Sequence, residues 1–269
     1  MVDGQASAES ALSAESSSSS ARTVTSKALA LLGAFEHPPA AKSLTELAGL
    51  ADLPLPTAHR LVGELVAWGA LERDGLGRYR VGLRLWEVAQ HGGRLLRDTA
   101  RPYLQDLFSL TQETSHLAIR EGHEALYIDR VYSTKRVPRA SRVGGRLPLH
   151  ATAVGKVLLA FEEDWVREAY LARGLERPTR RTHADPERLE AELAEIRSSA
   201  HAITLEEVRA GSASIAVPIR RDDRVVAAIG IVTLATQASA LRRHLPVLKG
   251  VADRIDTAIA RLPRGARLA

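Results

Sequence analysis

Hydrophobic positions in the first third of the chain follow the three- and four-residue spacing of amphipathic helices. The pattern predicts one helix over residues 24–35 and a second over 43–51, which opens with the capping-box sequence Ser43-Leu44-Thr45-Glu46. Asp52-Leu53-Pro54 interrupts the pattern, and a third helix is expected, with Pro56 in its first turn and residues 57–68 continuing it. Three short helices separated by breaks are therefore predicted at this end of the chain.

A hairpin follows these helices. Residues 71–73 and 78–81 flank a glycine-rich turn at 74–77, which favours two short antiparallel strands. Three helices followed by a hairpin are typical of a winged helix-turn-helix domain, which we assign to residues 23–82. Residues 83–114 again have a helical pattern, with an interruption at Gly92-Gly93. We expect this segment to be a linker and dimerisation helix.

The hydrophobic period shortens to two residues after position 114, although helical spacing returns between the strands. This mixture, with adjacent hairpins, indicates an α+β domain with a mainly antiparallel sheet over residues 115–262. The expected strands are 116–120, 125–132, 212–220 and 224–234, and the expected helices are 151–161, 185–198 and 237–262.

Composition narrows the class of protein. The 269 residues hold no cysteine, which excludes disulfides, thiolate metal sites and a cysteine nucleophile. Residues 1–22 are mostly Ser and Ala, and we expect a disordered tail because they offer little to bury. No apolar stretch approaches the ~20 residues that a membrane helix needs. Asp3 and Glu9 stand where a signal peptide carries positive charge. We expect a cytoplasmic protein with no membrane partner.

Charge does not locate a nucleic-acid site. The chain has 37 Lys+Arg and 32 Asp+Glu, a formal charge of +5. Residues 22–90 hold eight basic and seven acidic residues, a net +1, whereas residues 91–150 hold ten and six, a net +4. If the first domain binds DNA, recognition must therefore depend on a few placed side chains and on dimer geometry.

Candidate DNA contacts lie off the apolar face of the third predicted helix. The start of this helix approaches base edges in a winged helix-turn-helix, so Thr57, His59 and Arg60 are candidates. Arg60 suits a guanine or a phosphate, but Glu64 one turn away also offers it an ordinary ion pair. His59 fits a solvated surface position equally well. The candidates for phosphate or minor-groove contacts are Ser43, Thr45, Arg78 and Arg80.

Motifs for catalysis are not found in the sequence. Gly211-Ser212-Ala213-Ser214 lacks the spacing of a nucleophile elbow. Glu206 and Glu207 are adjacent and would face opposite sides of a strand, so a hydrogen-bonded loop or edge is the better interpretation. His116 and His123 lack metal-ligand spacing, and a buried polar histidine is the simpler interpretation. We expect no catalytic residues, no metal and no cofactor.

Several ordered motifs resemble the isocitrate lyase regulator (IclR) family of bacterial transcription factors. The resemblance is carried by Pro-Thr-Ala-His-Arg-Leu at 56–61, Gly-Arg-Tyr-Arg-Val-Gly at 77–82, the stretch 145–156, Glu206-Glu207, Gly211 and the strand 215–219. It covers roughly residues 24–262. It implies a winged helix-turn-helix domain, a linker helix and a GAF-like effector-binding domain. It also implies dimers or tetramers on palindromic operators, small carboxylate or aromatic effectors, and no enzymatic activity.

The resemblance further implies which residues bind the effector. Three elements of the second domain and one further position contribute them: Ala153, Val154, Gly155, Thr204, Ser212, Ser214, Gly230 and Val232. Free amides at the start of a helix favour an anion, so a carboxylate could bind there without an arginine. His150, just before that helix, is expected either to orient the loop or to touch the effector.

Two departures from the family pattern affect this site. Ala200-His201 stands where a Gly-Tyr pair is common, and residues 230–234 replace a Ser-x-Ser-Gly-Pro sequence. Because the second change removes two hydroxyl groups, we expect a more apolar pocket.

The predicted function is a sequence-specific DNA-binding transcriptional regulator, more often a repressor, controlled by a small metabolite. Its expected partners are a palindromic double-stranded operator, the effector and further copies of the chain. A dimer would hold its two recognition helices about one DNA turn, roughly 34 Å, or a multiple of it apart. The rival hypothesis is a small-molecule sensor or protein-interaction module that does not bind DNA.

Overall fold

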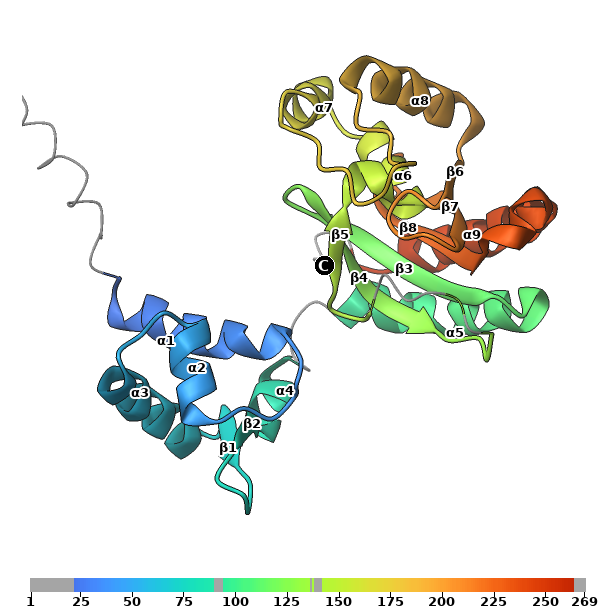
Figure 1. Ribbon diagram of the computed structural model, residues 1–269. Coiled ribbons are helices and arrows are strands. Elements are labelled where there is room, and N and C mark those ends of the chain that lie inside the picture. Colours follow the sequence, from blue (N-terminus) through green and yellow to red (C-terminus); the bar gives the residue numbers. More distant parts are fainter. Residues whose placement is uncertain (1–21, 90–93, 136, 138–141, 264–269) are drawn as a thin grey trace, which may run out of the picture. The chain divides into compact units, whose positions relative to one another are not determined.

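The computed structural model describes residues 22–89, 94–135, 137 and 142–263 (Figure 1). The chain divides into two compact units between Gly92 and Gly93. The predicted break at Gly92-Gly93 and the predicted tail, apart from Arg22, lie outside the described residues. Among the described residues, every helix is too short or too polar to cross a membrane.

The first unit is a winged helix-turn-helix, as its sequence pattern predicts. Its elements are α1 (Val24–Gly33), η1 (Ala34–Glu36), α2 (Leu44–Leu50), α3 (Leu55–Trp68), β1 (Leu71–Arg73), β2 (Tyr79–Val81) and α4 (Leu83–Ala89). The strands β1 and β2 pair antiparallel and form the wing. Helix α3 begins at Leu55, directly after its N-cap Pro54, so Pro56 lies in the first turn, as predicted, where no N–H is needed.

A buried lysine ties the wing to the helices of the first unit. Lys42 is 1% exposed, and its Nζ donates hydrogen bonds to the carbonyl oxygens of His37 at 2.8 Å and Pro39 at 2.9 Å. The backbone of Lys42 also pairs with that of Tyr79 in β2. The loop before α2 therefore holds the wing beside the helix-turn-helix.

The second unit is an α+β domain with an antiparallel sheet, as predicted. Its elements are α5 (Arg94–Thr111), β3 (Thr114–Glu121), β4 (Glu124–Val131), β5 (Arg146–Pro148), η2 (Leu149–Ala151), α6 (Ala153–Ala160), α7 (Asp164–Leu171), α8 (Pro186–Ser199), β6 (Ala202–Leu205), β7 (Ser212–Arg221), β8 (Arg224–Leu234), η3 (Ala235–His244) and α9 (Leu245–Ala260). The strand order is β5-β4-β3-β8-β7-β6. The sequence pattern missed β5 and β6, which are too short to show a period of two, and it missed α7.

Side chains alternate between the two faces of this sheet. One face is large and aliphatic, with Leu117, Ile215 and Ile229 in the cluster that packs against α5 and α9. The other face carries alanines such as Ala118 and Ala216 and packs against α6, whose eight residues are all buried. These small side chains let the helix approach the sheet closely, and the helix start then lies over the strands.

Two predicted helical segments are each divided in the structure, and a third contributes to a core. The segment 151–161 is divided by Thr152, which ends η2 and caps α6. The segment 237–262 is divided at Leu245, because Pro246 lacks an N–H and fits only in the first turn of α9. Most of the predicted linker is α5, and Leu96, Leu104 and Leu107 of this helix are fully buried in the core of the second unit.

Candidate functional sites

Helix α3 presents the predicted base-contacting side chains away from the core of the first unit. Ala58 is buried, whereas His59 and Arg60 are exposed and Thr57 is partly exposed. Arg60 Nη1 lies 2.6 Å from Glu64 Oε1, and the two side chains are 59% and 61% exposed. Such a surface pair contributes little to stability. Arg60 is therefore able to exchange Glu64 for a phosphate or a base.

The start of α2 is capped by its own side chains. Ser43 Oγ accepts a hydrogen bond from the Glu46 amide at 3.2 Å, and Glu46 Oε2 accepts one from the Ser43 amide at 2.6 Å. These hydrogen bonds hold the pKa of Glu46 below its usual value. A phosphate at this helix start would therefore have to compete with the Glu46 carboxylate for the Ser43 amide, and the role of Ser43 and Thr45 as phosphate contacts stays a prediction.

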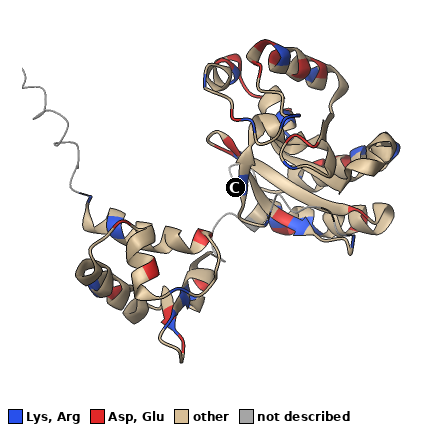
Figure 2. Cartoon of the chain, in the orientation of Figure 1, with Lys and Arg blue, Asp and Glu red and all other residues tan. Residues whose placement is uncertain are grey.

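The wing carries two arginines that already face acidic groups. Arg78 Nη2 lies 3.3 Å from Glu46 Oε2, and Arg80 Nε lies 3.9 Å from Glu72 Oε2, all on largely exposed side chains. Figure 2 shows basic and acidic residues interspersed over the first unit. The two arginines are therefore separate candidate contacts and not part of a continuous basic face, as the net charge of +1 over residues 22–90 predicts.

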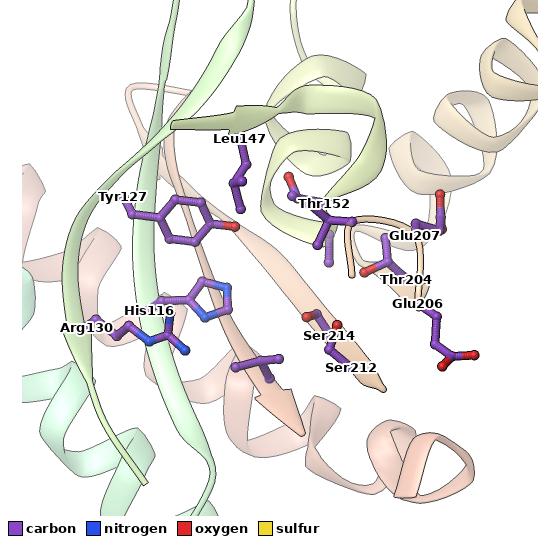
Figure 3. Close-up of a pocket in the computed structure, with 13 residues that line it drawn as sticks. His116, Tyr127, Arg130, Leu147, Thr152, Thr204, Glu206, Glu207, Ser212 and Ser214 are labelled. Atoms are coloured by element: carbon purple, nitrogen blue, oxygen red, sulfur yellow. The ribbon is translucent and has the colours of Figure 1, made fainter. Parts of the chain in front are cut away.

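A pocket lies between the sheet of the second unit and the start of α6 (Figure 3). Its cavity volume is about 30 Å³. The lining comes from all six strands of the sheet, the helix start and the loop after β6: His116, Tyr127, Arg130, Leu147, Thr152, Ala153, Thr204, Glu206, Glu207, Val208, Ser212, Ser214 and Val232. The lining includes five of the eight predicted effector-binding residues: Ala153, Thr204, Ser212, Ser214 and Val232.

Strand register explains why residues far apart in the sequence meet here. Thr204 pairs with Ser214, and Ser214 pairs with Val232, so the three side chains form one row across β6, β7 and β8. One row further along, His116 of β3 lies opposite Gly230 of β8. A Cβ atom on Gly230 would lie 3.0 Å from His116 Nε2. Gly230 thus makes room for the imidazole, although it is not part of the lining.

Val154 and Gly155 lie in the first turn of α6, behind the pocket lining. Both residues are buried. The Gly155 amide donates to Thr152 Oγ1 at 3.1 Å, and a Cβ atom on Gly155 would lie only 2.4 Å from the Leu149 carbonyl oxygen. Gly155 is therefore required for the tight turn that brings Thr152 and Ala153 to the pocket.

His116 is the most deeply buried ionisable group of the pocket lining. Its side chain points into the pocket in Figure 3, and the residue is 3% exposed. Burial, followed by the charge of Arg130, lowers the pKa of His116 to about 3, so the imidazole is neutral at pH 7. Its Nδ1 has no hydrogen-bond partner among the described residues. A buried polar atom without a partner is costly, which makes His116 a candidate ligand contact.

Polar and charged groups dominate the lining. Arg130 brings a guanidinium to the pocket, and Glu206 and Glu207 bring carboxylates. These groups come from elements other than β8, whose Val232 is an apolar contribution to the lining. The expectation that the pocket is more apolar than in other family members stays a prediction. The signal for Arg130 is present in the sequence. Asp129-Arg130 interrupts an apolar strand, and alternation puts the two charges on opposite faces.

A buried ion-pair network holds the loop after β6. Lys156 of α6 is fully buried, and its Nζ lies 2.7 Å from Glu192 Oε1 and 2.8 Å from Glu207 Oε2. His183 Nδ1 lies 2.8 Å from Glu192 Oε2. His183, Glu192 and Glu207 are close enough to ligate a metal ion, but the Lys156 ammonium already occupies both carboxylates. The prediction that Glu206-Glu207 forms a hydrogen-bonded loop is confirmed.

His150 orients a neighbouring loop. Its Nδ1 lies 2.8 Å from the Tyr170 hydroxyl and its Nε2 lies 2.8 Å from the Glu176 carbonyl oxygen. Burial is the main cause that lowers the pKa of His150. Since both ring nitrogens have protein partners and His150 is outside the lining of the pocket, the structure favours the orienting role.

Comparison with known proteins identifies the family. Residues 24–75 match the IclR helix-turn-helix domain, and residues 92–257 match the domain described as bacterial transcriptional regulator IclR C-terminal. The chain belongs to the IclR family. This confirms the family that the sequence motifs indicate, with its N-terminal helix-turn-helix and C-terminal α+β domain.

IclR-family relatives match three quarters or more of this chain. The HTH-type transcriptional regulator XynR of Escherichia coli is 34% identical over 220 residues, 78% of this chain and 86% of the relative. The HTH-type transcriptional repressor AllR of Escherichia coli is 33% identical over 76% of this chain and 78% of the relative. A crystal structure of an IclR homolog from Microbacterium hydrocarbonoxydans, complexed with 4-hydroxybenzoate, has a TM-score of 0.84 and 33% identity, covering 88% of this chain and 99% of that one.

Proposed function

We propose that this protein is a one-component transcription factor whose first unit binds an operator and whose second unit binds a small-molecule effector. One observation carries the proposal: the chain combines a winged helix-turn-helix with a separate unit that holds a polar pocket. Relatives of similar length are transcriptional regulators. We propose no enzymatic activity, and we place the protein in the cytoplasm, where its operator would lie.

The proposed DNA contacts are those the sequence predicts, and their positions in the structure divide them into base contacts and backbone contacts. Thr57, His59 and Arg60 at the start of α3 would read base edges, because they lie off the buried face of the helix. The wing and the start of α2 would contact the backbone through Thr45, Arg78 and Arg80. Ser43 would contribute through the capping of α2.

The proposed effector site is the pocket beside α6. An IclR homolog of similar fold binds 4-hydroxybenzoate, and a small carboxylate or aromatic compound is the class we propose for this chain. Ala153, Thr204, Ser212, Ser214 and Val232 would contact it. Val154, Gly155 and Gly230 would shape the site from behind the lining.

We propose that the chain acts as a homodimer or a dimer of dimers on a palindromic operator. Helix α4 supports this proposal, because Leu83, Trp86 and Val88 are 69%, 62% and 54% exposed. Exposed apolar clusters of this kind mark protein interfaces. We propose that a second copy of α4 covers this surface. A two-fold operator has two half-sites, and each needs one winged helix-turn-helix, so two copies of the chain must come together.

An electrophoretic mobility shift on the upstream region of the protein's own gene tests the proposal. Retardation by the wild type at moderate salt, weakened by Arg60→Ala, would support operator binding. No retardation by the wild type would refute it and favour a sensor without DNA. We propose repression as the mode of action, so a reporter gene should be more active without the protein. Lower reporter activity would instead identify an activator.

A further inference from the structure

Two residues on the strand side of the effector pocket have no role implied by the family resemblance. His116 of β3 is 3% exposed and Arg130 of β4 is 6% exposed. Aromatic rings hold both side chains in place. The ring centroids of His116 and Tyr127 are 5.3 Å apart, and Arg130 Cζ lies 4.9 Å from the centroid of Tyr132. Their polar groups are therefore fixed at the pocket instead of being free to move in solvent.

The acidic residues of the lining are already engaged with cations. Glu207 is bonded to Lys156, with Oε2 2.8 Å from Nζ. Glu206 Oε2 lies 2.9 Å from Arg181 Nε, and its Oε1 accepts from the Gly211 amide at 2.7 Å. Because these partners offset both carboxylates, the acidic residues of the lining do not exclude an anion from the pocket.

The opposite side of the pocket offers weaker anion binding. At the start of α6 the donors are neutral backbone amides, and the Gly155 amide already donates to Thr152 Oγ1. A guanidinium presents several donors in a planar fork that matches a carboxylate, and such charge-assisted hydrogen bonds are stronger than neutral ones. Arg130 is thus better suited than the helix start to bind a carboxylate.

We propose that Arg130 binds the carboxylate of the effector and that the imidazole of His116, whose Nδ1 has no partner among the described residues, hydrogen-bonds a second polar oxygen on it. The inference rests on the proposed function, since it assigns contacts within the proposed effector pocket. The neutral imidazole has one donor and one acceptor nitrogen, so it suits a hydroxyl group, which also donates and accepts. The ligand class that fits both contacts is therefore a small hydroxy acid, with a carboxylate for Arg130 and a hydroxyl group for His116.

Cavity size limits this ligand. A volume of about 30 Å³ has room for two or three water-sized molecules, at ~10–15 Å³ each. An acid of a few heavy atoms would nearly fill it, and a larger acid requires the lining to open. The loop after β6 is the part of the lining held mainly by side chains, through Thr179, Thr182 and Lys156.

Calorimetric titration of the full chain tests the assignment. The probes are propanoate, 2-hydroxypropanoate, benzoate and 4-hydroxybenzoate, each compared with its primary amide. We expect at least one hydroxy acid to bind roughly tenfold or more tightly than its amide, as a charge-assisted contact predicts. Arg130→Met should abolish the difference between acid and amide. His116→Leu should keep that difference but abolish the preference, roughly 2- to 10-fold, for the hydroxylated acid.

Two matched variants serve as controls. Arg224→Met removes an exposed arginine at the start of β8, and His123→Gln replaces a histidine that is not in the lining. Both should bind like the wild type. Equal binding of acid and amide by the wild type, no binding of any acid, or unchanged selectivity in Arg130→Met or His116→Leu would each overturn the inference.

A measurement on the wild type guards against variants that fail to fold. The ring ¹⁵N resonances of His116 should shift when the tightest acid is added, and an unchanged resonance would overturn the role of His116. Operator binding is measured on the same preparation. If DNA binding is intact while the acids fail, only this inference falls. If DNA binding is absent, the proposed function itself is refuted.

Discussion

Lys156 and Glu207 form an ion pair that joins the core helix of the second unit to the pocket. Lys156 Nζ lies 2.8 Å from Glu207 Oε2, and their side chains are 0% and 4% exposed. Glu207 also lines the pocket. The pair therefore couples the position of the pocket loop to α6, and neither charge tolerates loss of the other.

Lys156→Met should strongly destabilise the second unit. Removing one partner of a buried pair leaves an uncompensated charge and costs about 3–5 kcal/mol. Urea unfolding followed by circular dichroism measures the loss. Adding Glu207→Gln to this variant should recover part of the lost stability, because it removes the buried charge that Lys156 no longer compensates. The control Lys249→Met changes an exposed lysine of α9 and should unfold like the wild type. A Lys156→Met protein as stable as the wild type would contradict the prediction.

Arg60→Ala should weaken operator binding without unfolding the first unit. Loss of a base contact costs ~1–3 kcal/mol, a roughly 5- to 150-fold weaker affinity. The exposed pair with Glu64 contributes under ~1 kcal/mol to stability. Mobility shifts and thermal unfolding separate the two effects. Arg254→Ala is the matched control, because Arg254 forms a similar exposed pair with Asp106, at 2.6 Å, in the second unit. Equal DNA affinity of the two variants would exclude Arg60 as a contact.

Gly155→Ala should destabilise the start of α6 and with it the pocket. The new Cβ would lie 2.4 Å from the Leu149 carbonyl oxygen and 2.5 Å from Thr152 Oγ1, distances at which the backbone must move. We expect a loss of about 1–3 kcal/mol or more, as in other overpacked sites. Gly250→Ala in α9 is the control. Nothing lies within 4 Å of its Cβ position, so helix propensity should stabilise that variant by ~0.5–1 kcal/mol. Equal unfolding midpoints for the two variants would contradict this account.

Trp86→Glu in α4 should dissociate the proposed dimer. Trp86 is 62% exposed and lies in a helix with exposed Leu83 and Val88. A buried charge at a two-fold interface would meet its own copy and repel it. Sedimentation velocity should show a lighter species than the wild type. Trp165→Glu is the control, since Trp165 is 67% exposed on α7. A wild type that sediments as a monomer, or a Trp86→Glu protein that assembles like the wild type, would refute an interface through α4.

Sequence pattern predicted the elements with long, clear periods and missed those set by packing. The helix-turn-helix, its wing and the long strands β7 and β8 have strong periodicity and turn residues, so they were predictable. At the pocket, the family pattern indicated Ser212, Ser214 and Thr204, which register brings into neighbouring positions. Arg130 and His116 were not predicted as pocket residues. The charged pair Asp129-Arg130 in an apolar strand was a signal, but a bulge in the pairing of β3 with β4 decides which face Arg130 takes. His116 was expected only to be a buried polar histidine, because the sequence does not show that Gly230 of the distant strand β8 lies opposite it.

Acid should destabilise the second unit through His116. Its folded pKa is about 3, below the ordinary value of 6.5. Between these values the unfolded chain binds a proton that the folded chain does not, so the free energy of unfolding falls as pH falls below 6.5. His116 alone should account for a loss of about 2 kcal/mol between pH 7 and pH 5. The lowered pKa of His150 acts in the same direction.

Urea unfolding at pH 7, 6 and 5 measures this dependence. His116→Leu should remove the His116 contribution, so its stability falls less steeply with acid than that of the wild type. His123→Gln should keep the wild-type slope, because His123 is exposed. Carboxylates and His150 titrate alike in all three proteins, and the difference between slopes therefore isolates His116. Identical slopes in the wild type and His116→Leu would mean that His116 takes up its proton equally in the folded and unfolded states.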